Sequence, residues 1–240
     1  LKFKIIIPSE AGGLFLFNEE ELLKDKDFNI KNLNDYDFYC SILDLPYYLK
    51  INKKEIKKTF SPYVFANKKC DYSHFKDFFK IGICWAGNPK HSRDKERSCN
   101  LSLFEEIYKI PNVKIFSLQK ELNSRIRPYE KAPVNLANCS SIKIINMSPH
   151  MKTWEDTVSI IDGLDLVISV DTSILHLSGA MGKQTLGLLP FFPDWRWGVF
   201  EEKTYWYPTI KLFRQKEINN WKSVFEEVCD YVKKISLNAI

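Results

Sequence analysis

Short apolar runs alternate with segments of helical period from Lys80 to the end of the chain. The apolar runs predict strands at 81–85, 113–118, 142–145, 166–170, 185–189 and 210–213. The intervening segments predict helices at 102–109, 154–162, 173–181 and 221–235. Strands that are apolar on both faces and alternate with helices form parallel sheets covered on both sides. The pattern therefore predicts a Rossmann-like α/β domain at 80–240.

Residues 1–79 have a weaker pattern. They offer one clear strand at 3–7, a turn at Gly12 and Gly13, an acidic helix start near 19–23 and the apolar stretch DYDFYCSILDLPYYLKI. Pro62 breaks any helix in the linker that follows. This is too little regular structure for a complete α/β domain, so we expect a partial N-terminal domain and linker at 1–79.

Composition and charge narrow the class of protein. The chain is 45% hydrophobic and 14% aromatic, as expected for a folded globular protein. Its 35 Lys and Arg residues exceed 30 Asp and Glu residues, giving a formal charge of +5 without a block of like charge. This favours an anionic ligand and argues against nucleic acid as a partner.

The cysteines and the apolar runs indicate a cytoplasmic protein. None of the six cysteines forms a CxxC pair, which is typical of a reducing compartment. No apolar run reaches the ~18 to 20 residues that span a bilayer, and the opening LKFKIIIPSE lacks the features of a signal peptide. We expect no transmembrane segment, which leaves peripheral membrane contact open. Because the first residue is Leu1 rather than Met, we also expect a chain trimmed at its start.

Three polar segments directly follow predicted strands, where ligands bind in doubly wound sheets. The first is ICWAGNPKHSRDKERS at 83–98. Gly87, Asn88 and Pro89 favour a tight turn, and five basic or imidazole side chains follow within eight residues. A glycine turn with nearby cations suits a diphosphate. A solvated basic loop is the alternative interpretation.

The second segment is LDLVISVDTSILHLSGAMGK at 164–183. Asp171, Thr172 and Ser173 separate an apolar strand from a helix, with Asp171 as the candidate N-cap and His176 on the first turn. The free N–H groups and dipole of such a helix start form an anion site. The alternative is an ordinary capped helix with a core histidine.

The third segment, LLPFFPDWRWG at 188–198, gathers aromatic rings around Asp194 and Arg196. Rings with interleaved charges are typical of a sugar or base pocket, although rings that cap the sheet would give the same pattern. Other site types are excluded by missing motifs: GxGxxG, GxxxxGK[ST], GxSxG, HExxH and histidine pairs with zinc spacing do not occur.

Four segments together carry a resemblance to a known family. They are GICWAGNPKHSRDKERS, IFSLQKE, WEDTVSIIDGLDLVISVDTSILHLSGAMGK and LLPFFPDWRWG with the following YWYPTIKLFRQ. In this order they resemble the C-terminal half of the family 9 glycosyltransferases. These are relatives of the ADP-heptose:lipopolysaccharide heptosyltransferases, and the likeness is strongest to the bacterial branch often fused to tetratricopeptide repeats. The similarity spans about 38–232, with DYDFYCSILDLPYYL matching the end of the acceptor-side domain.

The resemblance implies a GT-B fold, in which 80–240 is the nucleotide-sugar-binding domain and 1–79 is part of an acceptor-side α/β domain. It implies that a nucleotide-diphosphate sugar binds without a metal or other cofactor. The implied donor-binding residues are Gly87, Asn88, Lys90, Arg97, Ser98, Gln119, Asp171, Thr172, Ser173, His176, Asp194 and Trp195. Among them Asp171, Thr172, Ser173 and His176 would meet the pyrophosphate and sugar, and Gln119 would lie near the base. The family's catalytic carboxylate is expected upstream of Leu1.

The leading hypothesis is therefore a metal-independent glycosyltransferase that transfers a sugar to a hydroxyl of a glycan, a lipopolysaccharide core or a protein. Negative charge builds on the departing diphosphate, so fixed cations and amide donors are needed there. This chain could be inactive on its own if the base is missing. The alternative is a non-catalytic nucleotide-sugar-binding module. A basic nucleic-acid binder fits the scattered charge least well.

Overall fold

The computed structural model describes residues 6–8, 14–16, 45–48, 50–52, 60–120 and 143–237. The chain divides into two compact units, Leu1–Lys58 and Thr59–Ile240. In the first unit, β1 (Ile6–Pro8) and β2 (Leu14–Leu16) pair as antiparallel strands, and α2 spans Leu45–Tyr48. The predicted strand at 3–7 overlaps β1. The predicted turn at Gly12 and Gly13 and the predicted helix start near 19–23 lie outside the described residues.

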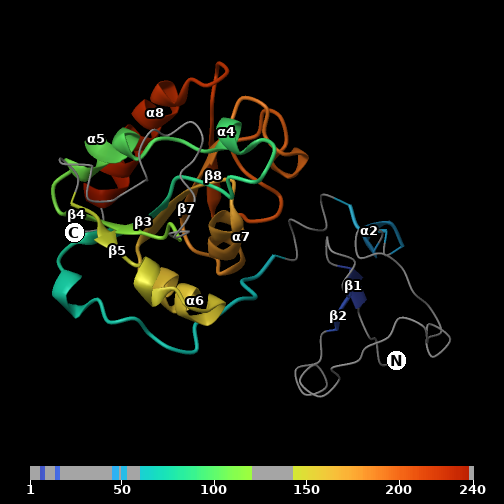
Figure 1. The fold of residues 1–240 in the computed structure, drawn as a ribbon, viewed down its shortest axis with the longest axis horizontal. Coiled ribbons are helices and arrows are strands. Elements are labelled where there is room, and N and C mark those ends of the chain that lie inside the picture. The colour runs from blue at the N-terminus through green and yellow to red at the C-terminus, as the bar shows by residue number, and fades with distance from the viewer. Residues whose placement is uncertain are drawn as a thin grey trace. The chain divides into compact units, whose positions relative to one another are not determined.

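The second unit contains a six-stranded parallel sheet (Figure 1). Its strands are β3 (Phe79–Cys84), β4 (Val113–Ser117), β5 (Ile145–Asn146), β6 (Leu166–Val170), β7 (Thr185–Leu189) and β8 (Ile210–Arg214). The spatial order is β5-β4-β3-β6-β7-β8, the doubly wound order of a Rossmann-like sheet. The predicted α/β class and parallel sheet are therefore confirmed.

Helices connect and follow these strands. They are η3 (Ser73–Phe75), α4 (Asp94–Arg97), η4 (Leu101–Phe104), α5 (Glu105–Tyr108), η6 (Ser148–His150), α6 (Trp154–Asp162), α7 (Ser173–Ala180), η7 (Trp195–Trp197) and α8 (Trp221–Leu237). The predicted bounds of α6, β6 and β7 are confirmed. The predicted helix at 102–109 is instead a 3-10 turn, η4, that continues into the short helix α5.

Alternate side chains of the central strands enter two different cores. Leu166, Ile168 and Val170 of β6 pack with η4, α5 and α8 in one hydrophobic cluster. Val167 of β6 packs with α6 and α7 in the other. Figure 1 shows α5 and α8 on one side of the sheet and α6 and α7 on the other. Two-sided cover explains why β6 and β7 are buried at every position and read as continuous apolar runs.

No helix among the described residues is long and apolar enough to cross a membrane.

The strand order places a topological switch point between β3 and β6. The chain runs from β3 outward to β4 and β5, and then returns to β6 and continues to β7 and β8 on the other side. In doubly wound sheets the loops beyond the carboxyl ends of the two central strands diverge and leave a crevice. The two polar segments that follow β3 and β6 are therefore brought together at this point.

Candidate functional site

The turns after β3 and β6 are in direct contact. The Arg97 side chain, at the end of the β3 turn, donates a hydrogen bond of 3.0 Å from Nη1 to the backbone carbonyl of Asp171. Asp171 follows β6 directly and precedes α7. The two sequence segments singled out for anion binding thus form one edge of the same crevice, although 74 residues separate the two partners.

A buried carboxylate holds the β3 turn in shape. The Gly87 N–H donates to Ser98 Oγ at 3.0 Å, and the Ser98 hydroxyl donates to Asp94 Oδ1 at 3.0 Å. Asp94 is 2% exposed and also accepts a bond of 3.4 Å from Arg97 Nε. A Cβ at Gly87 would collide with the Arg97 guanidinium, so the glycine lets the cation pack against the backbone. Asp94 and Ser98 therefore position Arg97 from behind.

The N-terminus of α7 is not closed by its own side chains. Asp171 was the candidate N-cap, but the structure places Thr172 at that position, and its side chain makes no capping hydrogen bond. Thr172 Oγ1 instead lies 3.1 Å from Ser169 Oγ and 3.6 Å from Cys84 Sγ. The nearest Asp171 carboxylate oxygen lies 3.9 Å from Nε2 of His176, beyond hydrogen-bond distance. Within the part of the chain that the structure describes, the first-turn amides of α7 thus have no side-chain cap.

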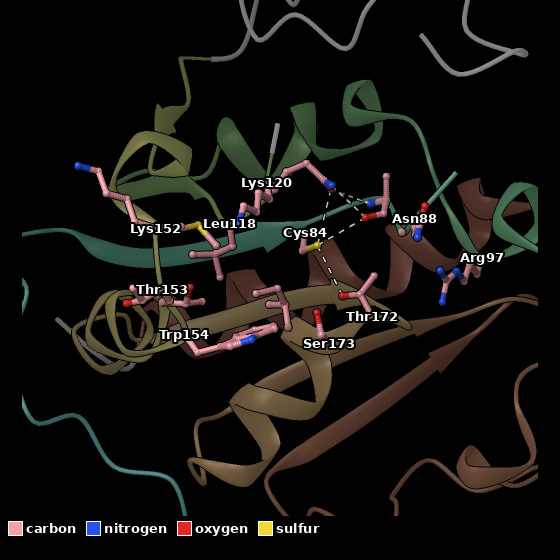
Figure 2. A pocket seen from close by; sticks show the side chains of 16 residues that line it. Cys84, Asn88, Arg97, Leu118, Lys120, Lys152, Thr153, Trp154, Thr172 and Ser173 are labelled. Carbon is pink, nitrogen blue, oxygen red and sulfur yellow. Dashed lines mark hydrogen bonds between the residues drawn. The ribbon is translucent and has the colours of Figure 1, made fainter. Parts of the chain in front are cut away.

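The first pocket, which we call the switch-point pocket, has a volume of 460 Å³ and lies beyond the ends of β3, β4 and β6. In Figure 2, Trp154 and Arg97 lie toward opposite ends of it, with Thr172 and Ser173 between them. Gly87 and Asn88 also line it. An elongated pocket with an aromatic ring at one end and a cation at the other can accept a planar base joined to an anionic group.

The second pocket, which we call the histidine pocket, has a volume of 620 Å³. It shares Arg97, Thr172 and Ser173 with the switch-point pocket, so the two adjoin at the start of α7. His176 and Asp194 also line it. The amide donors of one helix N-terminus therefore lie between two cavities rather than at the end of one.

His176 is held by aromatic neighbours. Its ring stacks on Trp197 with centroids 5.0 Å apart, and Nδ1 lies 3.1 Å from the Tyr207 hydroxyl. Burial lowers the pKa of His176 below its ordinary value, and this outweighs the opposite influence of Asp171. Because the pKa lies below the ordinary value of 6.5, the neutral form of His176 predominates at pH 7. A neutral imidazole can accept or donate a hydrogen bond toward a ligand without adding charge.

Gln119 lines the switch-point pocket with its amide already engaged. Its Oε1 accepts from the Ala86 N–H and its Nε2 donates to the Ala86 carbonyl, both at 3.0 Å. The side chain thus continues the pairing of β3 with β4 by one step beyond the strand ends. It holds the Ala86 backbone in position at the mouth of the crevice.

The other predicted site residues are spread more widely. Lys90 is exposed and lines neither pocket of the crevice, whereas Ser98 is buried behind the turn. Asp194 lines the histidine pocket and pairs with Arg196 at 2.7 Å. Trp195, its neighbour in sequence, lines a third cavity instead. The structure therefore brings together nine of the twelve residues, namely Gly87, Asn88, Arg97, Gln119, Asp171, Thr172, Ser173, His176 and Asp194.

Several lining residues were missed by the sequence reasoning. Met151, Thr153 and Trp154 line the switch-point pocket after β5. By contrast, Arg93 and Phe192 lie in the basic and aromatic segments that the sequence singled out. Both line the histidine pocket, where Arg93 Nη2 donates to the Phe192 carbonyl at 2.6 Å. The signal for the first group was their place at a strand's carboxyl end, but β5 has only two residues and gives a weak pattern.

Among the described residues, no group of three or more His, Cys, Asp or Glu side chains is arranged to hold a metal ion. No family model, curated protein or solved structure matches this chain. The fold and the site together show an α/β chain with a Rossmann-like parallel sheet and a crevice at its topological switch point.

Proposed function

We propose that this chain is a glycosyltransferase of GT-B type, resembling family 9, whose 80–240 domain binds a nucleotide-diphosphate sugar. The observation that carries the proposal is the uncapped N-terminus of α7 between two adjoining pockets, with Arg97 beside it. Helix amides and a guanidinium are the groups that bind diphosphates best. A nucleotide sugar has a diphosphate between two larger groups, which matches an anion site between two cavities.

The order of the pockets suggests how the donor lies. The nucleoside occupies the switch-point pocket, where Trp154 offers a ring 61% exposed for stacking. The diphosphate lies across Ser173 and Arg97, which both pockets share. The sugar enters the histidine pocket, where His176 and Asp194 can hydrogen-bond its hydroxyls.

The chemistry follows from this arrangement. The bond between the anomeric carbon and the diphosphate oxygen breaks, a bond to the acceptor oxygen forms, and the acceptor hydroxyl loses a proton to a base. Negative charge grows on the departing diphosphate, where the α7 dipole and Arg97 stabilise it without reorganising. This accounts for transfer without a metal. We place the base on the acceptor-side domain, and the acceptor is a glycan, a lipopolysaccharide core or a protein.

The proposal is tested by calorimetric titration with ADP, UDP and GDP and with their sugars. We expect one nucleotide to bind, and Arg97→Lys to weaken it about ten-fold because the planar guanidinium fork is lost. Lys95→Ala, on the same short helix but lining neither pocket, is the matched control. Lys90→Ala should weaken binding less than Arg97→Lys, since Lys90 is exposed.

Release of the nucleoside diphosphate in the presence of acceptor extracts then tests transfer. If no nucleotide binds, the proposal is wrong. If a nucleotide sugar binds and is neither hydrolysed nor transferred, the chain is a non-catalytic nucleotide-sugar-binding module instead.

A further inference from the structure

A third cavity, which we call the aromatic pocket, lies beside β8 and has a volume of 920 Å³. Its lining includes Phe192, Trp195 and Phe200, whose exposed fractions are 59%, 71% and 91%. Large aromatic side chains are seldom left this exposed in a cluster unless the surface binds something. Phe192 also lines the histidine pocket, whereas β8, Trp195 and Phe200 line neither pocket of the crevice.

Hydrogen bonds from Arg214 hold part of the wall of this pocket. The Arg214 guanidinium donates to the backbone carbonyls of Trp197, Gly198 and Glu201, so one side chain fixes the backbone on both sides of Phe200. Gly198 has a φ of +69°, which favours glycine at the bend before Phe200. The backbone that carries Phe200 is thus held by a partly buried cation and by a turn that favours glycine.

A buried amide in the lining has an unused donor. Gln215 is 4% exposed, and its Oε1 accepts from the backbone N–H groups of Phe191 and Asn219 at 3.2 and 3.1 Å. These two donors fix which end of the amide is the oxygen. The Nε2 end has no hydrogen-bond partner among the described residues. An unpaired buried donor is costly, and because this Nε2 atom has almost no exposed surface, a ligand oxygen would bond it only with a shift of the lining.

The charged side chains of the rim neutralise one another. Lys211 pairs with Glu202 at 3.0 Å, and Lys216 pairs with Glu227 at 2.5 Å. The Arg214 guanidinium is engaged by backbone carbonyls. The pocket therefore offers exposed aromatic side chains and little net charge, with one buried amide donor in its lining, which suits a neutral ligand that has both C–H faces and hydroxyl oxygens.

We propose that the aromatic pocket is a carbohydrate-binding subsite that holds a neutral portion of the acceptor glycan. That the bound glycan is the acceptor rests on the proposed glycosyltransferase function. Its link to the crevice is Phe192, which lines both the aromatic pocket and the histidine pocket. A glycan seated on the rings would lead toward the cavity assigned to the donor sugar. Trp195, expected from the resemblance to bind the donor, is reassigned here to the acceptor.

The test uses the whole chain on an array of neutral oligosaccharides, followed by calorimetry with the best ligand found. Trp195→Ala should weaken binding about ten-fold or more, because a stacking ring is removed. Gln215→Glu keeps the acceptor for Phe191 and Asn219 but removes the free donor, so it should also weaken binding. Ile218→Ala, an exposed apolar residue outside the pocket lining, is the matched control.

Each outcome separates this inference from the proposed function. Trp195→Ala removes an exposed side chain, so loss of glycan binding with an unchanged melting temperature and unchanged nucleotide affinity supports it. If no neutral oligosaccharide binds while a nucleotide does, the subsite is wrong and the proposed function stands. If the wild-type chain self-associates and Trp195→Ala abolishes that instead, the rings form a protein interface and the inference is overturned.

Discussion

Helices α6 and α7 begin at the same edge of the sheet, yet their N-termini are built in opposite ways. At α6, Thr153 Oγ1 accepts from the Asp156 N–H at 3.1 Å, and the Asp156 carboxylate accepts from the Thr153 N–H at 2.8 Å. This reciprocal capping box satisfies two end amides within the helix itself. At α7 the Thr172 side chain makes no such bond.

The difference teaches which helix start is free for a ligand. A capping box contributes to helix stability and occupies the donors that an anion would need. An uncapped start gives up that contribution. At α7 the Leu175 N–H bonds the Thr172 carbonyl, which leaves the amides of Ser173 and Ile174, two residues that line the crevice, together with the helix dipole. The N-cap residue of α7, Thr172, instead places its hydroxyl 3.1 Å from that of Ser169.

The largest expected effect comes from filling the open start of α7 with a negative charge. Ser173→Asp places a carboxylate in the first turn, where it interacts favourably with the helix dipole. It would repel a diphosphate, so we expect nucleotide affinity to fall about 100-fold, or about 2.7 kcal/mol, with the melting temperature unchanged or raised. Calorimetry and a thermal melt measure the two quantities, with Ser173→Asn as the uncharged control. Undiminished affinity would show that the diphosphate lies elsewhere.

A smaller effect is expected from opening the closed start of α6. Thr153→Ala removes the capping hydroxyl and should lower the free energy of unfolding by about 1 kcal/mol, measured by urea denaturation. Its effect on nucleotide affinity should be within about two-fold, because the hydroxyl is already occupied by Asp156. A loss of affinity as large as that of Ser173→Asp would mean that α6 also binds the anion. The proposed difference between the two helix N-termini would then be wrong.

The smallest effect is a difference in how the two helix starts respond to acid. Burial lowers the pKa of His176 on α7, so the unfolded chain takes up a proton below pH 6.5 before the folded chain does. The contribution of neutral His176 to the free energy of unfolding is therefore complete above pH 6.5. It is lost as the pH falls from 6.5 toward the lower pKa of the folded chain. On α6, the hydrogen bonds from Thr153 lower the pKa of Asp156 below its ordinary value of 3.8. The contribution of the Asp156 carboxylate to stability is therefore present above pH 3.8 and is lost only at lower pH.

Melting temperatures measured from pH 8 to pH 3 separate the two windows. His176→Gln should flatten the decline between pH 7 and pH 5, and Thr153→Ala should leave that part of the curve unchanged. A decline between pH 7 and pH 5 that persists in His176→Gln would contradict the assignment.

Local pattern was enough where an element interacts mainly with its own neighbours in sequence. The bounds of β6 and β7 follow from unbroken apolar runs, and those of α6 follow from the helical period of its segment. The strand at 142–145 was less well placed because β5 forms only two pairs with β4. The site was predicted in part, since Arg97 and Ser173 were named and Trp154 was not.

The sequence by itself determined the α/β class, the parallel strands and the polar turns after β3 and β6, because apolar period and turn residues act over a few neighbouring positions. Only the tertiary structure decided that these turns meet, that Gln119 is engaged by Ala86, and that Asp194 and Trp195 line different cavities. The physical reason is that strand order brings distant residues together, and hydrogen bonds between them decide which donors stay free.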